Sequence, residues 1–72
     1  MTNRQRIVAF LQLRSGSPFC DPCVLRGVRI RALSQVDAIV RALGMARKYY
    51  LRPRATRCAG CGEVRSCILY MG

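Results

Sequence analysis

The chain has 72 residues, 51% of them apolar, and carries 13 lysines and arginines against three aspartates and glutamates, which gives a net charge of +10 without any histidine. A chain of this length is expected to form a single domain over residues 1–72, and its apolar fraction excludes a disordered basic tail. Because it has no histidine and only three carboxylates for acid–base chemistry, we do not expect an enzyme.

The first predicted element is a helix over about residues 3–15. Its apolar residues recur at i, i+3 and i+4, the spacing of one helical face. Thr2 and Gln5 form the pattern of a capping box, and Gly16 is placed to end the helix.

A short second helix is predicted over residues 22–27. Asp21 is a suitable N-cap residue, and Pro22 occupies the first helical position, where its missing N–H has no cost. Gly27 is expected to stop this helix.

The clearest helical pattern covers residues 34–44. Ser34 is the predicted N-cap and Gly44 the predicted stop, and Asp37 and Arg41 are spaced to form an ion pair on its surface. The apolar residues of this helix fall on one face, which we expect to be buried: Val36, Ile39, Val40 and Leu43.

A β-hairpin region is predicted over about residues 47–70. Residues 49–51, 55–57 and 64–70 have the pattern of strands, and residues 58–62 form the reversal between the last two.

Two cysteine pairs, Cys20-x2-Cys23 and Cys58-x2-Cys61, lie 34 residues apart and form the ligand set of a structural four-cysteine zinc site. Two residues between thiolates let the chain turn so that both sulfurs reach one ion. Glycines flank Cys61, so the second pair resembles the knuckle of zinc-ribbon proteins. No signal peptide or apolar run long enough for a membrane span is evident. We therefore expect a cytoplasmic protein without a membrane partner, whose paired cysteines bind one Zn²⁺ rather than form disulfides.

Other uses of the cysteines remain open. The stretch from Cys20 to Cys23 resembles the CxPC active site of thioredoxin-like proteins, although no strand is predicted before it and no βαβ unit around it. The spacing Cys58-x2-Cys61-x5-Cys67 could help to hold an Fe–S cluster, and loosely resembles the cysteine-bearing wing of ferrous-iron-transport regulators, with one upstream cysteine missing. Two disulfides or buried free thiols are further alternatives. Cys67 is most simply a small buried apolar residue.

Three helices followed by a β-hairpin resemble the winged helix-turn-helix fold. Residues 23–28 look like the first helix of the motif with a glycine turn, and residues 34–44 look like a recognition helix, although the link between them is longer than usual. The resemblance implies an α+β domain whose wing carries the zinc knuckle. It also implies that the exposed face of the third helix enters the major groove of double-stranded DNA, as in a transcriptional regulator or accessory factor.

The candidate nucleic-acid-binding residues follow from this resemblance and from the positive charge. Arg41 could read guanine and Gln35 adenine, while arginines before the helix and in the wing would meet phosphates. Tyr49 and Tyr50 lie among the wing cations, although one of them could instead be a core residue by alternation. The predicted interface comprises Arg29, Arg31, Ser34, Gln35, Ala38, Arg41, Arg47, Lys48, Arg52 and Arg54.

Two other function classes fit the same pattern. A zinc-ribbon-like RNA-binding module would use the same charge and tyrosines for structured or single-stranded RNA. A protein-interaction module would present its basic face to an acidic partner. Because one small domain covers only a short DNA site, a homodimer is a further candidate partner.

Overall fold

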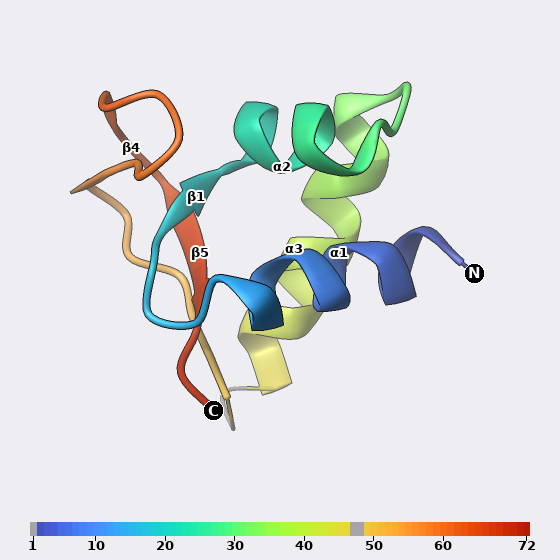
Figure 1. Cartoon of the computed structure of the whole chain (residues 1–72), viewed down its shortest axis with the longest axis horizontal. Helices are drawn as coiled ribbons and strands as arrows, with labels where there is room; N and C mark the ends of the chain where they lie inside the picture. The colour runs from blue at the N-terminus through green and yellow to red at the C-terminus, as the bar shows by residue number, and fades with distance from the viewer. Residues whose placement is uncertain (1, 47–48) are drawn as a thin grey trace.

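A computed structural model of the chain describes residues 2–46 and 49–72. Its elements, in chain order, are α1 (Asn3–Leu13), β1 (Phe19–Cys20), α2 (Asp21–Val28), α3 (Leu33–Ala46), β2 (Tyr50–Leu51), β3 (Thr56–Arg57), β4 (Val64–Arg65) and β5 (Cys67–Tyr70) (Figure 1). This arrangement confirms the predicted α+β class.

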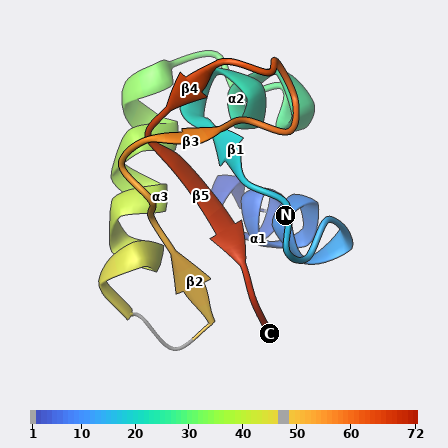
Figure 2. The same cartoon turned by 90° about the vertical axis from the view of Figure 1, so that its left-hand side faces the viewer.

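Strand β5 is the centre of a three-stranded antiparallel sheet with the order β1-β5-β2. Strands β3 and β4 form a separate two-stranded sheet at the far end of the same hairpin (Figure 2). Leu51 pairs with Leu69 and Thr56 with Arg65, so residues 52–55 on one arm face residues 66–68 on the other. The first arm therefore has one residue more than the second, which forms a β-bulge. The bulge bends the hairpin, so that the β2–β5 pair and the β3–β4 pair belong to different sheets.

The core is formed where the three helices meet the sheet. Each helix contributes residues one turn apart, and β2 and β5 cover them from the other side, as predicted for an amphipathic helical face. The buried cluster consists of Ile7, Leu11, Val24, Val28, Ile30, Val36, Val40, Leu43, Tyr50 and Ile68, with Ile39 and Phe10 partly buried against it.

Helix α1 begins as predicted. The side chain of Thr2 accepts a hydrogen bond from the Gln5 backbone N–H, and the Gln5 side chain accepts one from the Thr2 backbone N–H, which completes the capping box. The helix ends at Leu13, slightly earlier than expected. Gly16, with φ of +83°, lies in the turn that follows, and its N–H donates to the Tyr70 carbonyl at 2.7 Å, which ties this turn to the end of β5.

The two glycines predicted to stop α2 and α3 do not stop them. Helix α2 starts at Asp21, so its N-cap is Cys20 and not the predicted Asp21. It continues through Gly27 and ends at Val28, with Arg29 taking the left-handed conformation (φ 57°, ψ 45°) that glycine usually supplies. Helix α3 starts at Leu33, before the predicted N-cap Ser34, and passes through Gly44. Both glycines lie where another side chain crosses the helix: a Cβ on Gly27 would overlap the Phe10 ring, and one on Gly44 would lie 2.7 Å from Arg52 Cδ.

Two strand predictions were also wrong in part. The predicted single strand over residues 64–70 is divided at Ser66 into β4 and β5, which belong to different sheets. A strand that was not predicted, β1, does precede the Cys20–Cys23 pair. It pairs antiparallel with β5, and the sheets of the described residues contain only antiparallel pairs, so this strand does not belong to a βαβ unit.

Candidate functional site

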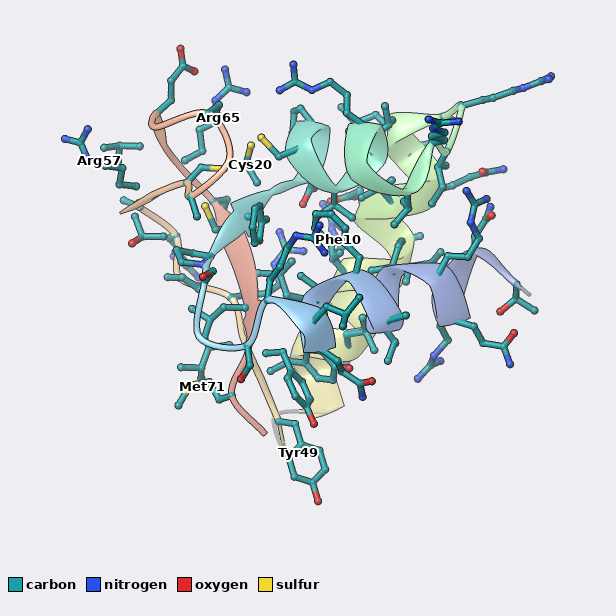
Figure 3. The ribbon with its side chains drawn as sticks, viewed as in Figure 1. Phe10, Cys20, Tyr49, Arg57, Arg65 and Met71 are labelled. Carbon is teal, nitrogen blue, oxygen red and sulfur yellow. The ribbon has the colours of Figure 1, made fainter. Side chains whose placement is uncertain are left out.

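The four predicted ligand cysteines lie together between the start of α2 and the tip of the hairpin. All four Sγ atoms are within 4.8 Å of one another. The Sγ atoms of Cys20 and Cys61 are 3.7 Å apart, and those of Cys23 and Cys58 are 3.5 Å apart. The sulfur atoms gather beside the labelled Cys20 in Figure 3. The grouping predicted from the two CxxC spacings is therefore confirmed, and this group could hold a metal ion.

Backbone hydrogen bonds position the second cysteine pair. In the knuckle, Gly62 N–H donates to the Cys58 carbonyl at 2.9 Å and closes the turn, and Gly62 has a φ of +77° that suits glycine. Ala59 N–H donates to the Pro18 carbonyl at 2.7 Å, which attaches the knuckle to the segment before β1. A Cβ on Gly60 would lie 2.8 Å from Cys23 Sγ, so glycine is needed there for the two pairs to approach each other.

The sulfur of Cys58 is surrounded by backbone donors. It accepts hydrogen bonds from the N–H groups of Cys20 and Gly60, both at 3.3 Å. Burial by itself raises the pKa of Cys58, but the backbone N–H groups of Cys20, Cys61 and Gly60 outweigh it and lower the pKa to about 6. Burial is the main reason that the pKa values of Cys20 and Cys23 are raised. A bound cation would stabilise all four thiolates.

The site fits a single tetrahedral ion. Four sulfurs at the usual Zn–S distance of about 2.3 Å lie roughly 3.8 Å from each other, and the observed 3.5 and 3.7 Å are close to this value. The thiolates around an Fe–S cluster are spread over several iron atoms and lie farther apart, so this arrangement is too tight for one. A Zn²⁺ ion held by these four cysteines would supply a fixed tetrahedral link between distant segments.

Three arginines lie around the cluster. Arg65 forms an ion pair with Glu63 at 2.5 Å and is also attracted to Cys20 and Cys61, interactions that raise its pKa, so it would offset part of the negative charge of four thiolates. Arg57 donates to the Gly62 carbonyl at 3.3 Å. In Figure 3 Arg57 points away from the helices, whereas Arg65 lies on the side of the knuckle that faces α2. Arg26, which the sequence analysis missed, donates to Cys23 Sγ at 3.6 Å. Its position three residues after Cys23, on the same face of a helix, was the available signal.

Cys67 is completely buried and packs against the cluster without belonging to it. Its Sγ lies 3.4 Å from the Arg65 carbonyl, within reach of a weak S–H···O hydrogen bond, and burial raises its pKa to about 11. The prediction that Cys67 is a small buried residue is confirmed. All five cysteines carry free thiols in the structure.

Most of the candidate nucleic-acid-binding residues lie at the surface. On α3 the predicted outer face is exposed, including Ala38 and Arg41, and the predicted pair between Asp37 and Arg41 forms at 3.1 Å. Gln35 is exposed, and its side-chain oxygen accepts a hydrogen bond from Asn3 at 3.3 Å. Arg29, Arg31, Ser34 and Arg54 are exposed and Arg52 is half-buried, while Arg47 and Lys48 lie outside the described residues. Of the two tyrosines, Tyr49 is exposed and Tyr50 is buried in the core.

A small polar cluster links the start of α2 to α3 and to the segment after β2. Asp21 is half-buried, and burial raises its pKa, while the nearby guanidinium groups of Arg52 and Arg41 oppose this and Asp37 adds to it. Asp21 Oδ1 and Arg52 Nη1 are both fully buried, and within the described part of the chain neither has a hydrogen-bond partner. Arg52 is therefore held partly beneath the surface, and among the predicted interface residues that the structure describes it is the least available to a phosphate.

Comparison with known proteins gives no match for this chain among family models, curated protein sequences or solved structures. Among the described residues, no helix is both long and apolar enough to cross a membrane.

Proposed function

We propose that this protein is a double-stranded DNA-binding domain of the winged helix-turn-helix type, in which one structural zinc ion joins the helical half to the wing. The observation that carries the proposal is the position of the four-cysteine group. It lies between the N-terminus of α2, the first helix of the proposed motif, and the tip of the β3–β4 hairpin.

The element order supports this proposal. Helices α2 and α3 pack against each other and are joined by the short link of residues 29–32. The sheet places β5 between β1 and β2, so β2 and β5 form a hairpin after the last helix, where a wing would be expected, with Tyr50 and Ile68 packed on the helices. Figure 2 shows the hairpin tip reaching back to the start of α2. In a domain this small, zinc binding worth about 10–16 kcal/mol would exceed the stabilising free energy that the hydrophobic core supplies.

The exposed face of α3 supports DNA as the partner. Ala38 is small and exposed, which would allow close approach of the helix to a groove, and Arg41 is exposed and carries the forked guanidinium group that can read guanine. Arg29 and Arg31 precede the helix and are exposed, which suits phosphate contacts. With a net charge of +10, affinity should fall steeply as salt increases, because each phosphate contact releases a counterion.

The test is selection of preferred duplexes from a random pool by zinc-loaded protein, followed by binding curves at several salt concentrations. Arg41→Ala should lose roughly 5- to 150-fold in discrimination between preferred and altered sites. The matched control is Arg14→Ala, which removes one exposed charge at the far end of α1. It should change the affinity for all duplexes equally, if at all.

Three outcomes would contradict the proposal. Tighter binding to single-stranded or structured RNA than to any duplex would favour the RNA-binding alternative. Absence of nucleic-acid binding would favour a protein-interaction module with an acidic partner. Anaerobically purified protein that contains less than one zinc ion per chain would contradict the proposal that a metal joins the helical half to the wing.

A further inference from the structure

The four cysteines differ in their access to solvent. Cys20 and Cys58 are 1% exposed and Cys23 is 8% exposed, whereas Cys61 lies at the surface of the knuckle. A metal-bound thiolate is still a nucleophile, and its oxidation depends on whether an oxidant can reach it. Cys61 is therefore more accessible to an oxidant than the other three cysteines, although all four belong to one site.

A cavity of about 450 Å³ opens beside this exposed sulfur. Cys61 and Cys20 both line it, but only Cys61 is exposed, so a small molecule inside it reaches the Cys61 sulfur first. The remaining walls are Pro22, Leu25, Arg26, Glu63 and Arg65. Glu63 is paired with Arg65, so the two guanidinium groups leave this wall with one net positive charge, which favours an anionic thiolate and any anion that forms during its reaction.

The buried sulfurs are less available. Cys58 Sγ accepts two backbone N–H groups, and Cys23 Sγ is held by Arg26 at 3.6 Å. Neither residue lines the cavity. The nearest thiol measured from Cys61 is that of Cys20, at 3.7 Å. A disulfide requires about 2.05 Å, so the two sulfurs need to approach by less than 2 Å. Gly60 and Gly62, on either side of Cys61, make this movement of the backbone accessible.

We propose that Cys61 is a site of oxidation by hydroperoxides, and that Cys20 resolves the oxidised sulfur to form a Cys20–Cys61 disulfide that releases the metal. This inference rests on the proposed zinc site. It gives the same residues a second, chemical role.

The oxidation takes place in two steps. The Cys61 thiolate attacks one oxygen of hydrogen peroxide, an S–O bond forms, the O–O bond breaks and hydroxide leaves, so that sulfur is oxidised by two electrons and peroxide is reduced. The Cys20 thiolate then attacks the sulfenic sulfur, an S–S bond forms and the S–O bond breaks, releasing a second hydroxide. Two thiolates and one peroxide thus give one disulfide and two hydroxides. The zinc ion, left with two protein thiolates, dissociates.

Release of the metal would loosen the contact between the hairpin tip and α2, because Cys23 and Cys58 would lose their shared ion and become free thiols. The Cys20–Cys61 bond would still connect the two segments. A dithiol reductant together with Zn²⁺ should restore the original site.

The experiment treats the zinc-loaded full chain with hydrogen peroxide under anaerobic conditions and follows zinc with a chromogenic chelator. Samples taken over time are alkylated and digested, and the disulfides are mapped by mass spectrometry. We expect one zinc released for each Cys20–Cys61 disulfide formed, with Cys61 the first cysteine to become protected from alkylation. The variant Cys67→Ala serves as the control and should keep the same pairing and a rate within twofold of the wild type.

Several results would overturn the inference. A first disulfide that contains Cys67, or one that joins Cys58 to Cys61, would show that access through the cavity does not select the pair. Oxidation of Cys61 to sulfinic acid without a disulfide would exclude Cys20 as the resolving thiol. A chain that holds one zinc and keeps it in peroxide would overturn this inference but leave the proposed function intact. A chain that takes up no zinc would remove the basis of both, and the zinc content measured before peroxide is added separates these two failures.

Discussion

The Sγ atoms of Cys23 and Cys58 lie 3.5 Å apart although 35 positions separate the two residues in the chain. Between them the chain completes α2, the whole of α3 and the outgoing arm of the hairpin. A single contact point therefore closes a long loop, and whatever holds the two sulfurs together stabilises every element inside that loop.

Removal of the metal should weaken the whole fold. Adding a strong chelator to zinc-loaded protein, or introducing Cys58→Ser, should lower the free energy of unfolding by several kcal/mol, because zinc binding to small domains is worth about 10–16 kcal/mol. Urea denaturation followed by circular dichroism measures this loss. Cys67→Ala should still bind one zinc per chain, since Cys67 packs beside the site but is not one of the four grouped cysteines. Unchanged unfolding after chelation would mean that the metal has no structural role.

Gly27→Ala should destabilise the protein although alanine favours a helix. The added Cβ would overlap the Phe10 ring, with only 2.8 Å to its Cζ atom, and that ring also packs edge-to-face on Phe19. Overpacking of this kind costs about 1–3 kcal/mol, more than the ~1 kcal/mol gained in helix propensity. Thermal unfolding of the single variants Gly27→Ala and Phe10→Leu and of the double variant forms a cycle. The double variant should recover part of the loss, and additive effects would disprove the contact.

Arg29→Gly should raise stability and lower DNA affinity at the same time. Arg29 has a φ of 57°, and the left-handed conformation costs a non-glycine residue about 1–2 kcal/mol. Part of the gain is offset by the larger conformational entropy of glycine in the unfolded chain, so we expect a net gain of about 0.5–1 kcal/mol. Arg31→Gly, which removes the same charge two residues later where φ is not positive, should weaken DNA binding without any increase in melting temperature.

Asp37→Asn should strengthen binding to duplex DNA. Asp37 pairs with Arg41 at 3.1 Å, but the two side chains are 38% and 72% exposed, so the pair contributes only about 0.3–0.5 kcal/mol to stability. The substitution frees Arg41 and removes a negative charge from the proposed DNA-binding face. Fluorescence anisotropy at low salt should show affinity increasing severalfold. Glu63→Gln removes one negative charge at the knuckle instead and should have less effect; an equal effect would mean that only net charge matters.

Tyr50→Phe should remove part of the stability loss at alkaline pH. Burial raises the pKa of Tyr50, with repulsion from Tyr70 adding to the shift and Arg4 opposing it. A group whose pKa is higher in the folded state stabilises the fold below its unfolded pKa, here about 10, and loses that contribution as the pH rises through the folded pKa. Urea unfolding of the zinc-loaded protein between pH 8 and 11 measures this. Parallel curves for wild type and variant would show that Tyr50 does not ionise in this range.

Residue patterns within short stretches of the sequence predicted the helix cap, the surface ion pair, the buried helix faces and the cysteine pairs. The Thr2–Gln5 capping box and the Asp37–Arg41 pair form because their partners are three or four positions apart on one helix. The buried faces of α1 and α3 follow from their apolar spacing. The two cysteine pairs were recognisable because each pair is only two residues apart, and thiolate chemistry does not depend on the length of chain between the pairs.

Long-range contacts decided the rest. Glycine is a common helix stop, but Gly27 and Gly44 lie within helices, and the Phe10 ring and the Arg52 stem occupy the space that a Cβ would need, so close packing and not termination explains glycine at these positions. Strand β1 exists because β5 offers it a hydrogen-bonding edge, and the split at Ser66 follows from a bulge that sends β4 and β5 into different sheets.

By itself, then, the sequence determined three helices, a hairpin and four candidate ligand cysteines, because spacing and charge act over short stretches of chain. Only the tertiary structure decided that the start of α2 meets the hairpin tip, that Cys61 faces solvent while Cys58 is buried, and that Arg52 lies partly beneath the surface. These properties depend on which distant segments pack together. Burial and access are therefore set by the complete fold and not by any local pattern.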